Sequence, residues 1–263
     1  MQDLRGSEQV GGKFDKNHRV FNINWDCIIV DEAHEGTQTQ LGQNVLEALT
    51  KPTTKVLQLS GTPFNLFNQY KEDEIYTWDY VMEQRAKAQW DETHFGDPNP
   101  YSGLPTMNIY TFDLGRLMAK YMDMDVAFNF TEFFRTRDNG TFVHEQDVRA
   151  FLDLLTKPDK ESLFPFSNEE FRRCFHHTLW MLPGVRAAKA LSAMLQIHPV
   201  FGNFEIVNVA GEGDDDAEKG DALELVQKAI RRSDYTITLS CGKLTTGVSV
   251  PEWTAVMMLS GTF

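Results

Sequence analysis

The chain has 263 residues, 41% of them hydrophobic, which is enough for one large domain or two modest ones, each with its own core. Its net charge of -13 excludes a generally basic surface that attracts nucleic acid, so any contact with DNA is expected to be focused in a local groove. The three cysteines lack C-x-x-C spacing and no apolar run reaches the roughly 18–20 residues of a membrane span, which predicts a soluble, cytoplasmic protein without a disulfide framework.

The first part of the chain predicts a strand, a helix and a second strand. The run "VFNINWDCIIVD" (residues 20–31) ends in four continuous apolar positions, which is typical of a strand covered on both faces in a parallel sheet. The apolar residues of "QLGQNVLEALT" (40–50) have helical spacing, and "TKVLQLSGTP" (54–63) predicts a strand that ends at a turn. This order indicates a crossover unit of an α/β sheet.

Residues 68–165 are more aromatic and charged, and we expect a mainly helical insertion there. Its predicted helices cover residues 74–90, 113–122 and 145–156. The aromatic side chains of Trp78, Tyr80 and Trp90 favour packing in a core or between domains, with stacking on nucleic-acid bases as the alternative.

From residue 166 onward an alternating α/β pattern returns. The predicted helices cover residues 184–198 and 219–233, and the predicted strands cover residues 203–211, 235–242 and 253–261. The acidic stretch 211–221 is interpreted as a solvated loop, because runs of like charge usually remain in water.

Two adjacent carboxylates, Asp31 and Glu32, follow the first predicted strand directly. Ligands of parallel sheets gather beyond the carboxyl ends of the strands, so both residues occupy a favourable position. One carboxylate there can hold Mg²⁺ against nucleotide phosphates while its neighbour orients and deprotonates the attacking water. An Asp-Glu pair that merely opens a turn or caps a helix is the simpler alternative.

Three motifs together resemble superfamily 2 helicases and translocases. "VDEAH" (30–34) looks like the DEAH box, and "LSGTP" (59–63) looks like the S-G/A-T motif that follows it. "LTTGVSVPEWTAVMML" (244–259) resembles an element of the second motor domain that touches nucleic-acid phosphates and the nucleotide. The stretches "HTLWMLPGV" (177–185) and "LSCGKLTTGVSVPEW" (239–253) look most like the motors of restriction-modification-type helicases.

For the first motor domain, the resemblance implies that Asp31 binds Mg²⁺, that Glu32 is the catalytic residue that activates water, and that His34 couples the nucleotide site to the second domain. Ser60 and Thr62 would relay between the nucleotide state and domain closure.

For the second motor domain, the resemblance places Thr245, Thr246 and Gly247 near the nucleic-acid backbone or the cleft between domains, with Gly247 also toward the nucleotide. Many members carry Asp two residues after this glycine, whereas this chain has Ser249, which puts the contact expected there in doubt.

Two motor motifs are not found in this chain. The nearest match to the phosphate loop G-x-x-x-x-G-K-[ST] runs from Gly6 to Phe14, but its spacing is one residue too long and Phe14 replaces the Mg²⁺-binding hydroxyl. The arginine-bearing motif expected after the last strand is missing too. We therefore expect an internal segment of a longer protein, which would be inactive alone because such arginines contribute about 10³- to 10⁵-fold to related reactions.

The sequence thus predicts an α/β chain with parts of two RecA-like motor domains: residues 1–67 from the first, a helical insertion over 68–165, and residues 166–263 from the second. The leading hypothesis is a segment of an ATP-dependent DNA helicase or translocase of a restriction-modification system. Its cofactors would be ATP and Mg²⁺, and its partners would be DNA and nuclease or methyltransferase domains or subunits. The alternative is a non-catalytic nucleic-acid-binding or scaffolding module with a degenerate motor fold.

Overall fold

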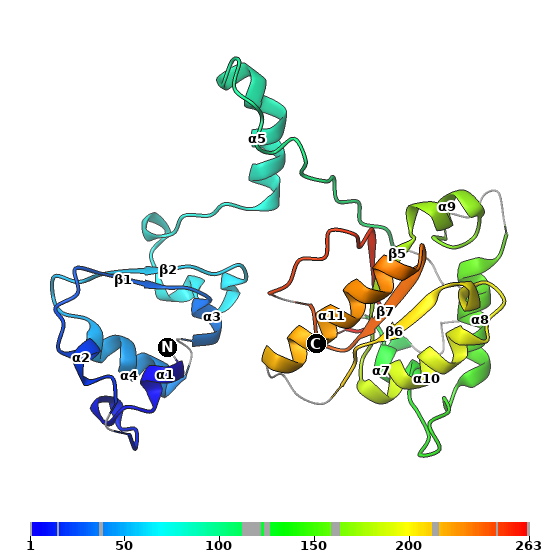
Figure 1. Cartoon of the computed structure of the whole chain (residues 1–263), viewed down its shortest axis with the longest axis horizontal. Coiled ribbons are helices and arrows are strands. Elements are labelled where there is room, and N and C mark those ends of the chain that lie inside the picture. The colour runs from blue at the N-terminus through cyan, green and yellow to red at the C-terminus, as the bar shows by residue number, and fades with distance from the viewer. Residues whose placement is uncertain are drawn as a thin grey trace. The chain divides into compact units, whose positions relative to one another are not determined.

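The computed structural model describes residues 2–14, 16–36, 39–111, 122–123, 127–158, 164–211, 216–245 and 247–261 (Figure 1). It divides into two compact units, Met1–Asn108 and Ile109–Phe263. No helix among the described residues is long and apolar enough to cross a membrane. Of the helix predicted over 113–122, all but the last residue lies outside the described residues.

The first unit is built around a pair of parallel strands. Strand β1 (Cys27–Val30) pairs with β2 (Lys55–Gln58), so that Ile28 lies opposite Val56 and Val30 lies opposite Gln58. Helix α4 (Gln40–Leu49) connects them, and its first turn is capped by Thr39, whose hydroxyl accepts a hydrogen bond from the Gly42 amide at 3.2 Å. The predicted order of strand, helix and parallel strand is confirmed.

The core of this unit lies under one face of the strand pair. Buried side chains of α4 pack with those of the short helical segments before β1. These segments are α1 (Gln2–Arg5), η1 (Glu8–Val10) and α2 (His18–Phe21). The elements that follow the strands are α3 (Ala33–Gly36), η2 (Pro63–Asn65), η3 (Phe67–Gln69) and η4 (Glu72–Glu74).

Helix α5 (Tyr80–Thr93) stands apart from that core and contains no buried residue. It begins later than the range 74–90 predicts, because the Asp79 carboxylate accepts a hydrogen bond from the Met82 amide at 2.9 Å and so caps the first turn. The Trp90 ring stacks on His94 at 3.8 Å and meets Tyr101 edge-on. One face of Trp90 is therefore already occupied within this segment.

The second unit contains a four-stranded, wholly parallel sheet in the order β6-β7-β5-β8. Its strands are β5 (His177–Met181), β6 (Glu205–Asn208), β7 (Thr236–Ser240) and β8 (Ala255–Met258). The last three confirm sequence predictions. Strand β5, an inner strand of the sheet, was not predicted as a strand.

Helices cover both faces of this sheet. Helix α10 (Val185–Gln196) packs in the cluster that holds Trp180 and Leu239, whereas α11 (Asp216–Arg232) packs in the cluster that holds Val207. Both helices confirm the sequence prediction, but α11 begins at Asp216, so the prediction of a loop over the whole stretch 211–221 is wrong for residues 216–221. Parallel sheets need this cover because their strands carry apolar side chains on both faces. The chain is thus α/β with parallel sheets in both units; their identity as RecA-like motor domains stays a prediction.

An aromatic cluster joins residues 127–158 to the core of the second unit. Phe133, Phe134, Phe142 and Phe151 are buried and belong to the same apolar cluster as Trp180. The remaining elements of the second unit are β3 (Met122–Asp123), β4 (Ala127–Phe128), α7 (Phe130–Phe133), α8 (Glu145–Thr156), α9 (Glu169–Cys174) and η6 (Phe201–Asn203). Helix α8 has the predicted bounds. The division between the units falls inside the range 68–165, and the role of that range as an insertion stays a prediction.

Candidate functional site

The DEAH and S-G-T motifs meet at the carboxyl ends of β1 and β2. The strand ladder continues past Val30, because the Leu59 amide donates to the Val30 carbonyl at 2.9 Å and the Ala33 amide donates to the Leu59 carbonyl at 3.0 Å. Ala33 is fully buried and fixes the start of α3 at this edge. Two motifs almost thirty residues apart in the chain are therefore held side by side.

Ser60 connects the two motifs through its side chain. Its Oγ lies 2.8 Å from His34 Nδ1 and accepts a hydrogen bond from the Thr62 amide at 3.1 Å. His34 is mostly covered, with 22% of its side chain exposed, and its Nδ1 also lies 3.4 Å from Glu32 Oε2. The structure thus brings Glu32, His34, Ser60 and Thr62 together.

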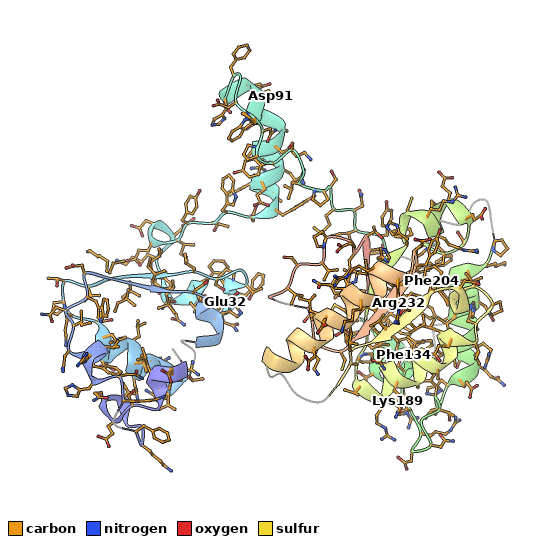
Figure 2. The ribbon with its side chains drawn as sticks, in the orientation of Figure 1. Glu32, Asp91, Phe134, Lys189, Phe204 and Arg232 are labelled. Atoms are coloured by element: carbon orange, nitrogen blue, oxygen red, sulfur yellow. The ribbon has the colours of Figure 1, made fainter. Side chains whose placement is uncertain are left out.

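The two carboxylates are open to solvent. Asp31 accepts a hydrogen bond from the Glu32 amide at 2.9 Å, and the Glu32 side chain is 58% exposed. Figure 2 labels Glu32 beside α3, at the end of the strand pair. Glu32 has a φ of 47°, a conformation that a non-glycine residue rarely adopts. Two solvated carboxylates at a strand tip can bind a cation that keeps much of its water shell.

The third motif lies in the second unit, in the turn that follows β7. Thr245 is exposed and its hydroxyl donates to the Gly242 carbonyl at 2.6 Å. Gly247 is exposed with a φ of 71°, a conformation that favours glycine. Ser249 is exposed as well, whereas Thr246 lies outside the described residues.

Lys243 directly precedes this motif and is not among the residues predicted from the sequence. Only 8% of Lys243 is exposed, although lysine is almost never fully buried. Burial raises the pKa of the neighbouring Cys241 thiol, and the positive charge of Lys243 opposes that rise. Its position next to the motif is the signal in the sequence that points to Lys243.

Among known proteins, the chain is similar to a curated protein of a restriction-modification system. No family model matches the chain, and no solved structure matches it. Among curated proteins, the chain is 26% identical over 325 aligned residues to "Putative type II restriction enzyme and methyltransferase RM.MpnORF110P C-terminus" from Mycoplasma pneumoniae. The alignment covers 98% of this chain and 45% of that protein, so the chain spans less than half the length of this relative.

Proposed function

We propose that this chain is part of an ATP-dependent DNA helicase or translocase of a restriction-modification system. Hydrolysis of ATP would drive movement on DNA in the full-length protein. The partners would be DNA, held in a focused groove because the chain is acidic, and nuclease or methyltransferase domains or subunits.

The observation that carries the proposal is the contact between His34 Nδ1 and Ser60 Oγ at 2.8 Å. A turn-opening Asp-Glu pair has no need of a partner motif on the next strand. A motor that couples its nucleotide state to a second domain needs such a partner motif, because a structural change at the nucleotide site must pass from the strand tip to a neighbouring loop. The Thr62 amide, which also binds Ser60, extends this connection along the second motif.

Each residue at the strand tips has a chemical role in this proposal. Asp31 would hold Mg²⁺, which neutralises charge on the nucleotide phosphates. Glu32 would orient the attacking water and accept its proton, for which its open position is suitable. His34, Ser60 and Thr62 would couple this site to the second motor domain, where Thr245, Thr246 and Gly247 would meet the nucleic acid and the nucleotide.

The restriction-modification setting is supported by the described role of the Mycoplasma pneumoniae relative, which aligns with nearly the whole chain. The two parallel α/β units also suit a motor with a nucleotide site at strand tips, since ligands of such sheets bind beyond the carboxyl ends of the strands.

The test is DNA-stimulated ATP hydrolysis by the full-length protein and its Glu32→Gln variant. We expect hydrolysis to fall by about 10²- to 10⁴-fold, as for the loss of a general base, with nucleotide affinity largely unchanged because Asp31 remains. The control is Glu47→Gln, since Glu47 is an exposed carboxylate on α4 of the same unit. Near-normal hydrolysis by Glu32→Gln would refute the role of Glu32, and an inactive wild-type protein would refute the motor.

A further inference from the structure

Lys243 lies in the tight turn between β7 and the exposed residues Thr245 and Gly247. The Ser240 hydroxyl donates to the Lys243 carbonyl, and the Thr245 hydroxyl donates to the Gly242 carbonyl at 2.6 Å. These bonds fold the chain back over the carboxyl end of β7. Because only 8% of Lys243 is exposed, its side chain is directed into the protein rather than into water.

The ammonium group of Lys243 reaches the segment that follows β6. A Cβ added to Gly211 would lie 3.0 Å from Lys243 Nζ and 3.9 Å from its Cε. Gly211 follows Val209 and Ala210 at the carboxyl end of β6, and β6 is the neighbour of β7 in the sheet. One side chain thus spans the tips of two adjacent strands.

The turn around Lys243 is also fixed on its other side. Leu244 is 2% exposed and packs in the cluster of Val226, with Val248 and Trp253 against it. Its φ is 61°, a conformation disfavoured for leucine, so packing holds the backbone in a shape that it would not adopt alone. The side chains of Lys243 and Leu244 are therefore both buried and both anchor the turn.

We infer that Lys243 is a positioning residue for the turn that presents Thr245 and Gly247. Its ammonium group lies beside Gly211, where an added side chain would crowd it. What Thr245 and Gly247 then bind rests on the proposed function, whereas the contact itself does not.

The first test is amide hydrogen exchange of peptides that span Ser240 to Gly247, in the 263-residue chain. Lys243→Met removes the charge and should speed exchange by about 10-fold, and Gly211→Ala should speed it by about 5-fold by crowding the ammonium group. The Gly211 backbone does not require glycine, since its φ lies outside the left-handed region, so crowding is the expected effect of the added methyl group.

The double variant gives the decisive comparison. If Gly211→Ala acts by crowding Lys243, it should add nothing once Lys243 is Met, so the double variant should match Lys243→Met. Independent, multiplying effects would overturn the inference, and so would wild-type exchange in both single variants. Peptides that contain β5 report whether each variant remains folded.

Matched controls are available in the same unit. A Cβ at Gly184 meets no atom within 4 Å, and Gly184 is in an extended conformation, so Gly184→Ala should leave exchange at 240–247 unchanged. Lys189, labelled on α10 in Figure 2, is exposed, so Lys189→Met tests the loss of a surface charge. An increase in either control as large as that in the test variants would overturn the assignment.

The second test measures function in the full-length protein. Lys243→Met should raise the concentration of linear duplex DNA needed for half-maximal ATP hydrolysis by about 10-fold, with less than about a twofold change at saturating DNA, because a misplaced turn weakens binding more than turnover. A fall in turnover without a change in the DNA concentration would contradict a positioning role. If the wild-type protein shows no DNA-stimulated hydrolysis, the proposed function fails, while the exchange experiment still decides the contact of Lys243 with Gly211.

Discussion

Phe133 offers a direct test of whether residues 127–158 belong to the core of the second unit. Its ring is fully buried, at 4.8 Å from the ring of Phe134 and 5.9 Å from that of Phe151. A buried Phe removes on the order of 150 Å² or more from water, which at about 25 cal/mol per Å² is roughly 4 kcal/mol. We expect Phe133→Ala to lower the free energy of unfolding of this unit by about 3–5 kcal/mol, because a cavity remains as well.

The assay is urea-dependent amide exchange of peptides that contain β5 and β7, which reports the opening of the second unit alone. The control is Ile197→Ala: Ile197 lies in the same unit but is 73% exposed, so this change should cost less than about 0.5 kcal/mol. A loss below about 1 kcal/mol for Phe133→Ala would refute the reasoning, since residues 127–158 would then be a separable attachment to the sheet.

Two further predictions concern buried polar groups of the second unit. Thr238 is fully buried, and its hydroxyl has no hydrogen-bond partner in the described part of the chain. Thr238→Val should therefore stabilise this unit by about 1 kcal/mol in the same assay. A destabilised variant would contradict this prediction. Burial lowers the pKa of His198 below its ordinary 6.5, although contact with Asp153 opposes this. The unfolded chain therefore binds the proton more readily, and stability should be full above about pH 6.5 and fall as the pH drops toward the folded-state pKa. His198→Asn should flatten this part of the stability profile below about pH 6.5, and an unchanged slope would exclude His198 as its source.

Much of the fold could be predicted because its elements carry a local signal. The apolar run that ends the range 20–31 and the helical spacing of residues 40–50 each required only neighbouring residues to interpret. Both elements are present, but the strand covers Cys27–Val30 alone, because helix α2 occupies the start of the predicted range, and the helix ends at Leu49. Strand β5 is not predicted from the sequence although four of its five residues are buried, because it begins with the polar residues His177 and Thr178 and ends close to Pro183 and Gly184. A short apolar run of this kind is ambiguous by periodicity alone.

The candidate site was predictable in part for a different reason. The proximity of His34 and Ser60 follows from the rule that the carboxyl ends of parallel strands lie at one edge, together with motifs that fall directly after the strands. The burial of Lys243 carries no such local signal. It depends on the neighbouring strand β6, whose approach places Gly211 next to the lysine, and lysine in a polar turn is ordinarily exposed. Only tertiary structure shows this contact.

Strained backbone conformations occur within two of the motifs, at Glu32 and at Leu244. Three non-glycine residues of the described chain have a positive φ: Asn17, Glu32 and Leu244. Asparagine tolerates this conformation, so the substantial cost, about 1 kcal/mol or more each, falls on Glu32 and Leu244. Leu244 is compensated by burial in an apolar cluster, but the side chain of Glu32 is exposed and gains little from packing. The ladder bonds at Val30 and Ala33 hold Glu32 in place from both sides, and in the proposed function this strain would serve to direct its carboxylate. A site that positions a water molecule accounts for such an orientation, whereas a simple turn could relieve the strain with glycine.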